Sequence, residues 1–137
     1  MAEDKKVKVV LVDDEPHIVE MYQSTLENAG YEIFPATNGK EALELITKEK
    51  PDFVLSDIVM PGSDGFYLLQ KMKNNKELKD IPVVMLTNLN NTEDKEEAKN
   101  LGACGYFVKV MYTPLELANK IKKNFDNHEC DKKDFIE

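Results

Sequence analysis

Three carboxylates, a hydroxyl and an ammonium group each follow a short apolar run in this chain. Asp13 and Asp14 follow VKVVLV, Asp57 follows DFVLS, Thr87 follows IPVVML, and Lys109 follows CGYFV. If these runs are parallel strands of one sheet, all five groups gather at its carboxyl edge, where open α/β folds bind their ligands. We therefore expect a single site assembled from positions that are far apart in the sequence.

The chemistry that this set favours is phosphoryl transfer. Three crowded aspartates repel one another unless a proton or a cation neutralises them, and Mg²⁺ is a natural partner because it prefers carboxylate oxygens and keeps some of its waters. The ammonium of Lys109 and the hydroxyl of Thr87 would stabilise charge on a transferring phosphoryl group. A carboxylate can also accept that group as an acyl phosphate. Asp57 is the best candidate because it ends a buried run and precedes an exposed loop, IVMPGSDG.

The elements that would position these groups are five strands that alternate with five helices. Strands are expected over 7–12, 31–36, 52–56, 81–87 and 104–109. Helices are expected over 16–29, after an Asn38 cap, over Gly65–Lys73 after an Asp64 cap, over 92–101, and after a Thr113 cap. Every gap between strands is longer than the ~12 residues that a parallel crossover needs. Right-handed crossovers then predict a doubly wound, flavodoxin-like (βα)5 sandwich with a parallel sheet in the order 2-1-3-4-5.

Length and composition indicate one ordinary globular domain. The chain has 137 residues and a formal net charge of -8, and we expect one domain over 1–125 followed by a polar tail or short helical extension over 126–137. The acidic balance argues against direct nucleic-acid binding. No apolar run approaches the ~20 residues that span a bilayer, and no signal-peptide pattern is present.

The two cysteines, Cys104 and Cys130, form no metal-ligand motif. We therefore expect a cytoplasmic protein with reduced thiols, in which Cys104 is a small core residue.

The segments VDDE, SDIVMPGSDG, LTN and GYFVK closely resemble those of receiver domains in two-component response regulators, and the resemblance extends over about 7–125. It implies that Asp57 is the phosphoacceptor. It also implies that Asp13 and Asp14 form the acidic pair, with Asp14 binding Mg²⁺ directly and Asp13 acting mostly through water. Val59 would offer its backbone carbonyl to the ion. Thr87 would be the switch hydroxyl, Tyr106 the aromatic that turns inward with it, and Lys109 the partner of the phosphoryl group.

Two positions depart from the pattern of that family. The lysine is usually followed by proline across a cis peptide, whereas Val110 follows it here. Because a cis bond before a residue other than proline costs ~2.5–4 kcal/mol, we predict a trans bond and an altered loop. The residue after the switch hydroxyl is usually small, but here it is Asn88, whose side chain could obstruct the phosphoryl site or hydrogen-bond to it.

The sequence thus predicts a stand-alone receiver that works as a phosphorylation-dependent switch. It would take a phosphoryl group from a histidine kinase or phosphotransfer protein, hydrolyse it by its own chemistry, and change its binding to a downstream protein target. Apart from this phosphoryl transfer and its own dephosphorylation, we expect no enzymatic activity. Few apolar anchors occur over 92–101, so the surface around this segment and Tyr106 is the expected output region.

Three rival interpretations remain. The chain could be a receiver-like scaffold that binds a partner without phosphorylation, with Val110 and Asn88 marking lost switching. A Mg²⁺-dependent phosphatase with an aspartyl nucleophile usually has DxDx[TV] after its first strand, and DDEPH does not fit this pattern. A flavodoxin-like electron carrier would need a phosphate-binding loop rich in Ser, Thr and Gly there, and none follows the first run.

Overall fold

The computed structural model describes residues 6–125 and contains one five-stranded parallel sheet in the order β2-β1-β3-β4-β5. The strands are β1 (Lys8–Val12), β2 (Glu32–Ala36), β3 (Phe53–Ser56), β4 (Val83–Thr87) and β5 (Gly105–Val108). The helices are α1 (Pro16–Asn28), α2 (Gly39–Glu49), α3 (Gly65–Lys73), α4 (Thr92–Asn100) and α5 (Pro114–Phe125), with a short 3-10 turn η2 (Lys109–Met111). The predicted fold class and strand order are confirmed. The expected extension over 126–137 lies outside the described residues.

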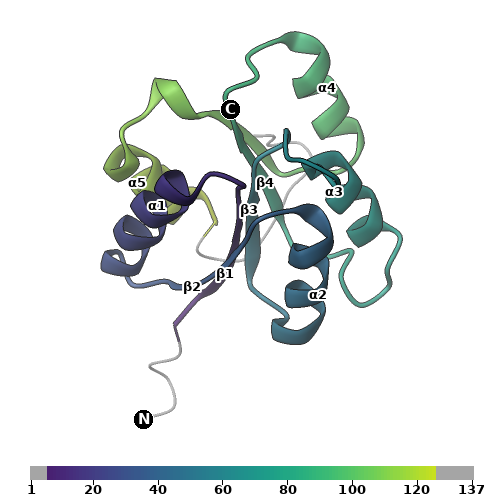
Figure 1. Ribbon diagram of the computed structural model, residues 1–137, viewed down its shortest axis with the longest axis horizontal. Coiled ribbons are helices and arrows are strands. Elements are labelled where there is room, and N and C mark those ends of the chain that lie inside the picture. The colour runs from purple at the N-terminus through teal and green to yellow at the C-terminus, as the bar shows by residue number, and fades with distance from the viewer. Residues whose placement is uncertain (1–5, 126–137) are drawn as a thin grey trace.

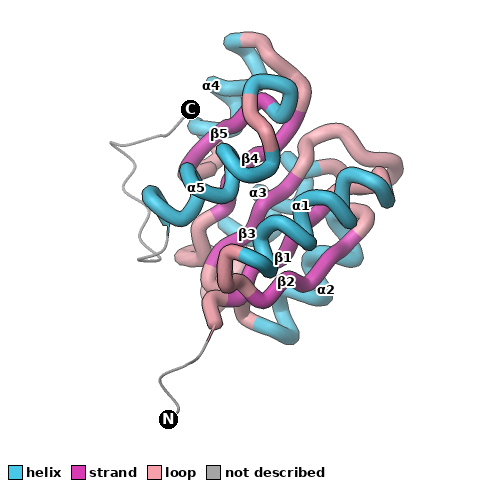
Figure 2. Tube along the Cα trace, turned by 90° about the vertical axis from the view of Figure 1, so that its left-hand side faces the viewer, coloured by secondary structure: helices cyan, strands magenta, loops and turns pink. Residues whose placement is uncertain are grey.

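Helices cover both faces of the sheet, which explains the nearly continuous apolar runs in its strands. All residues of β3, β4 and β5 are buried, whereas the edge strand β2 alternates between buried and exposed positions. Helices α1 and α5 lie on one face, and α2, α3 and α4 lie on the other (Figure 1). Seen from the side of α1 and α5, the strands form a single layer behind these two helices (Figure 2).

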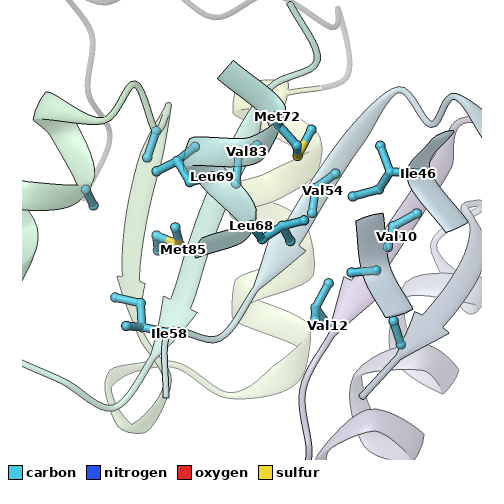
Figure 3. Close-up of a cluster of buried hydrophobic side chains, with 14 of the residues drawn as sticks. Val10, Val12, Ile46, Val54, Ile58, Leu68, Leu69, Met72, Val83 and Met85 are labelled. Atoms are coloured by element: carbon cyan, nitrogen blue, oxygen red, sulfur yellow. The ribbon is translucent and has the colours of Figure 1, made fainter. Parts of the chain in front are cut away.

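The sheet separates two apolar clusters. On the side of α2, α3 and α4, strand residues Val10 and Val54 pack with Ile46 of α2 and Leu68 of α3 (Figure 3). On the other side, residues of α1 and α5 such as Leu26 and Ile121 pack against alternate strand positions. Alternation along a strand sends neighbouring side chains to opposite faces, so each central strand contributes to both clusters.

All five predicted strands begin one or two residues before the observed strands, and at two of them the extra residues belong to turns. The Tyr31 amide donates to the carbonyl of Leu26 at 3.1 Å, which makes it part of the turn that ends α1. The Ile81 amide donates to the carbonyl of Leu78 at 3.0 Å, so this residue also belongs to a turn before β4. At the other end of the sheet, Lys109 starts η2 instead of ending β5.

Side-chain caps begin α2, α3 and α5, as the sequence predicts. Asn38 and Asp64 accept hydrogen bonds from the amides of Glu41 and Tyr67, at 2.8 and 2.9 Å. Thr113 accepts a hydrogen bond from the amide of Glu116 at 3.1 Å in the first turn of α5. These bonds satisfy amides that have no partner within the helix.

Helix α4 is anchored weakly. Ala98 is its one buried residue, although Asn91 caps its first turn by accepting a hydrogen bond from Asp94. Because little apolar area holds this helix on the sheet, its local stability should be low. This agrees with the sparse apolar residues noted over 92–101.

Cys104 does not carry the free thiol that we expected. It is buried just before β5, with 3% of its surface exposed, and it is disulfide-bonded. Its predicted place in the core is therefore confirmed, but the prediction of reduced thiols is wrong for this residue. Cys130 lies outside the described residues. Among residues 6–125, the structure contains no helix long and apolar enough to cross a membrane.

Gly65 allows the first turn of α3 to lie against the end of β3, and we predict that Gly65→Ala destabilises the protein. An added Cβ would lie 2.3 Å from the carbonyl oxygen of Asp57, and this neighbour is backbone, which cannot rotate away. Overpacking of this kind costs about 1–3 kcal/mol. Urea unfolding should show the loss, with Gln70→Ala on the exposed face of the same helix as control. Equal stability of the two variants would contradict this prediction.

Candidate functional site

The register of the sheet places the polar residues at one edge. Val12 pairs with Ser56 across β1 and β3, so Asp13 and Asp57 both lie one step beyond the last pair. The Asp57 amide donates to the carbonyl of Val12 at 2.9 Å, and this bond ties the ends of the two strands together. Neighbouring parallel strands end at the same edge, so residues 44 positions apart become spatial neighbours.

The expected group of three aspartates forms at this edge. Asp13, Asp14 and Asp57 each offer a carboxylate oxygen, and these oxygens lie within 4.8 Å of one another. Asp13 and Asp57 are buried, with 2% and 9% of their surfaces exposed, while Asp14 is half-buried. So close a group of negative charges needs compensation by a positive charge.

Lys109 supplies part of that compensation. Its Nζ lies 2.5 Å from Oδ2 of Asp13 and 2.9 Å from Oδ2 of Asp57, so one ammonium bridges the ends of two strands. The other oxygens accept backbone hydrogen bonds: Oδ1 of Asp57 from the amide of Ile58 at 2.7 Å, and Oδ1 of Asp13 from the amide of Glu15 at 3.0 Å. Charge-assisted bonds of this kind are short and strong, and they fix the carboxylates before any ligand arrives.

Burial and pairing shift the pKa values of the ionic pair. Burial raises the pKa of Asp13 above its ordinary value, although the hydrogen bonds from Lys109 and the Glu15 amide act to lower it. For Lys109, burial acts to lower the pKa, but hydrogen bonds to Asp13 and Asp57 outweigh this and raise it. Lys109 therefore remains an ammonium at neutral pH.

A pocket of about 450 Å³ opens above these groups. Its lining consists of Asp14, Glu15, Ile18, Asp57, Val59, Thr87, Asn88, Leu89 and Lys109. Four of the five groups that the sequence singled out thus line one cavity, and Asp13 lies beside it through its bond to Lys109. Val59 is 61% exposed, in the loop that follows β3.

Thr87 is connected to Tyr106 through the loop after β4. The Thr87 hydroxyl accepts a hydrogen bond from the amide of Leu89 at 3.3 Å, and the carbonyl of Leu89 accepts one from the Tyr106 hydroxyl at 2.7 Å. Tyr106 points inward, with 1% of its surface exposed. Burial, with smaller effects from Asp94 and Asp57, raises the pKa of Tyr106 to about 12, so its hydroxyl keeps its proton and donates.

Two contacts at the site were not predicted from the sequence. Ser63, in the loop after β3, accepts a hydrogen bond from the Lys40 amide through its hydroxyl and one from the Gly39 amide through its carbonyl, both at 2.8 Å. These bonds fasten the loop to the first turn of α2. Asn88 accepts a hydrogen bond from the Val110 amide at 3.2 Å. The peptide bond before Val110 is trans, as predicted, since the described chain contains no cis peptide.

Comparison with known proteins identifies the class of protein that this fold and site define. A sequence model of the response regulator receiver domain matches residues 9–122. The chain belongs to this family.

Solved structures agree with this assignment. Chemotaxis response regulator CheY4 of Vibrio cholerae is 35% identical, with a TM-score of 0.80 over 87% of this chain and 98% of that one. A CheY-like response regulator receiver domain protein from Methanospirillum hungatei JF-1 is 29% identical, with a TM-score of 0.81 over 90% and 97% of the two chains. The Mn²⁺-bound form of response regulator Rcp1 is 25% identical, with a TM-score of 0.76 over 86% and 93%.

The donor set fits a hard divalent cation. All three convergent side chains are carboxylates, which Mg²⁺ and similar ions prefer over nitrogen or sulfur ligands. Each carboxylate oxygen has two lone pairs, so the oxygens of Asp13 and Asp57 that bond Lys109 or backbone amides keep the capacity to accept a further partner.

We predict that Asp13→Asn stabilises the folded protein at pH 7 when no divalent ion is present. The pKa of Asp13 is raised on folding, so its stabilising contribution is full below the ordinary value of 3.8 and is lost as the pH rises through the folded pKa. A neutral amide should avoid this loss, so the free energy of unfolding should rise. Urea unfolding at pH 7 and near pH 4, in EDTA, should therefore show a gain that is larger at pH 7. Asp80→Asn, an exposed acid with the same charge change, is the control, and a gain of equal size there would contradict the assignment to Asp13.

Proposed function

We propose that this receiver domain is a switch of a two-component or phosphorelay system that accepts a phosphoryl group on Asp57. The observation that carries the proposal is the shared environment of Asp57: two other aspartates and Lys109 converge on it at the mouth of one pocket. A carboxylate oxygen of Asp57 attacks phosphorus while the bond from phosphorus to the donor breaks. The donor leaves as a neutral histidine or, with acetyl phosphate, as acetate. Water later attacks the acyl phosphate and releases inorganic phosphate.

The chain's own residues prepare this transfer. Before the reaction, the Lys109 ammonium bonds the Asp57 carboxylate and holds it in place. After the transfer, the same ammonium would pair with a negatively charged phosphoryl oxygen. The Ile58 amide orients the Asp57 carboxylate through Oδ1. Thr87 carries a hydroxyl proton that it can donate to a phosphoryl oxygen from the wall of the pocket.

A bound Mg²⁺ would neutralise charge on the carboxylates and on the phosphoryl oxygens. We assign direct binding to Asp14 and Asp57, binding mostly through water to Asp13, and a backbone carbonyl ligand to Val59. The carboxylate-only donor set supports a hard ion, and the Mn²⁺-bound form of the related regulator Rcp1 supports a divalent one.

The output follows from the contacts of Leu89. If the Thr87 hydroxyl turns to the phosphoryl group, the Leu89 amide loses its acceptor, and the segment whose carbonyl holds Tyr106 is free to shift. Tyr106 lies beside α4, where the Lys95 ammonium is 6.0 Å from its ring centroid. Phosphorylation would then bias an existing equilibrium of this loop and α4, which is how ligands drive most two-state switches.

The partners implied are a histidine kinase or phosphotransfer protein as donor and a downstream protein as target. We place the phosphoryl transfer in the cytoplasm, because the donor proteins obtain their phosphoryl groups from ATP, which is a cytoplasmic compound. The rival function is a receiver-like scaffold that binds its partner without phosphorylation. Asn88 favours that alternative, since it lines the pocket where the family usually has a small residue.

The decisive experiment is incubation with acetyl phosphate and Mg²⁺ followed by intact-mass measurement. We expect a gain of one phosphoryl group that is lost in EDTA and in Asp57→Asn. Asp64→Asn is the matched control, because asparagine can still cap α3 and the adduct should persist. Absence of any adduct in the unsubstituted protein would instead support the scaffold.

Hydrogen exchange tests the proposed output. On addition of beryllofluoride and Mg²⁺, amides of Leu89 and of α4 should change their exchange rates, because Thr87 would release the Leu89 amide. The last turn of α2, where Glu49 pairs with Lys8 at the start of β1, serves as the internal reference. Thr87→Val should abolish the change in α4. An identical response in Thr87→Val would show that the signal does not pass through the hydroxyl.

A further inference from the structure

A hydrogen bond joins the two loops that follow β4 and β5. The Val110 amide donates to Oδ1 of Asn88 at 3.2 Å. Backbone pairing between these strands ends where Thr87 pairs with Val108, one residue before Asn88 and two before Val110. The side-chain amide of Asn88 therefore continues the connection between the strands beyond the point where the backbone ladder stops.

Apart from the ion pairs of the Lys109 side chain, few contacts among the described residues hold the backbone of the turn that carries Lys109. None of the residues of η2 is buried, and Val110 and Met111 are 79% and 63% exposed, so apolar packing does not fix their backbone. The turn closes through a hydrogen bond from the Tyr112 amide to the Lys109 carbonyl at 3.2 Å. Beyond it, the Tyr112 ring packs edge-on against Phe107, with centroids 5.7 Å apart. Within the described residues, the bond from Val110 to Asn88 is the backbone contact that joins this turn to the end of β4.

The two departures from the family pattern are chemically complementary. A proline after the lysine would have no amide hydrogen to donate, and a small residue after the switch hydroxyl would have no acceptor within reach. This chain has a donor at Val110 and an acceptor at Asn88, and the structure joins them. Each of the two positions therefore carries the group that the hydrogen bond requires.

We propose that Asn88 is a positioning residue that holds the backbone between Lys109 and Val110 and thereby keeps the Lys109 ammonium between Asp13 and Asp57. Asn88 acts through the Val110 amide, and this hydrogen bond restrains a backbone position that a proline would restrain through its ring. The consequence for phosphoryl transfer rests on the proposed function. The hydrogen bond between Asn88 and Val110 does not depend on the proposed function, so its role can be tested separately.

The first test measures amide exchange of Val110 by NMR in the unphosphorylated protein. Asn88→Ala should raise its exchange about threefold to tenfold, the range expected for loss of one exposed hydrogen bond. Asn88→Asp keeps an acceptor oxygen and should keep the protection. Asn90→Ala, an exposed asparagine in the same loop, should change nothing. Unaltered exchange at Val110 in Asn88→Ala would overturn the proposal, whether or not the protein is phosphorylated.

The second test is a double-mutant cycle with Val110→Pro, which removes the amide hydrogen. With acetyl phosphate, Asn88→Ala should slow the phosphorylation rate constant about threefold to tenfold in the natural background. In the Val110→Pro background, the same substitution should have no further effect. Equal effects in both backgrounds would mean that Asn88 acts by direct contact in the pocket and not through Val110. If no variant accepts a phosphoryl group, the proposed function fails, and the exchange measurement still decides the role of Asn88.

Discussion

The site depends on one electrostatic constraint, which is that buried carboxylates from two adjacent strands share a single ammonium. Lys109 lies within bonding distance of both Asp13 and Asp57, and its own burial is tolerated because of these bonds. Asp13 remains destabilised as an anion even so, because burial raises its pKa. Burial of apolar residues on both faces of the sheet must offset the free-energy cost of burying this carboxylate. The stability of the charged site therefore depends on the packing of the core.

The loops around the site are held to very different degrees. The loop after β3 is fastened by close backbone approach at Gly65 and by the hydrogen bonds of Ser63 to α2. The loop after β4 is held by the bond between Asn88 and Val110 and by two bonds of Leu89, and α4 beyond it buries Ala98 alone. Asp57 is thus held in a fixed position, while the loop after β4 can change its hydrogen-bond partners. A switch requires both a rigid site and a segment that has two arrangements.

Much of this arrangement could be read from the chain, and the errors have local causes. Continuous apolar runs identified the strands, and capping residues such as Asn38 and Asp64 marked where helices begin. The starts of all five strands were placed one or two residues too early. At two of them, Tyr31 completes the turn that ends α1 and Ile81 completes a turn before β4, and apolar periodicity does not reveal these turns. The expectation of a free thiol at Cys104 failed because the chemical state of a cysteine does not follow from spacing.

The sequence by itself determined that polar residues follow the strands, and in a parallel sheet this is enough to bring them to one edge. Only the tertiary structure decided which of them touch. The bond between Asn88 and Val110 and the anchoring of Ser63 join loops whose separation depends on strand order and register. Hydrogen bonds act over about 3 Å, so such contacts are set by the packed fold and leave no periodic signal along the chain.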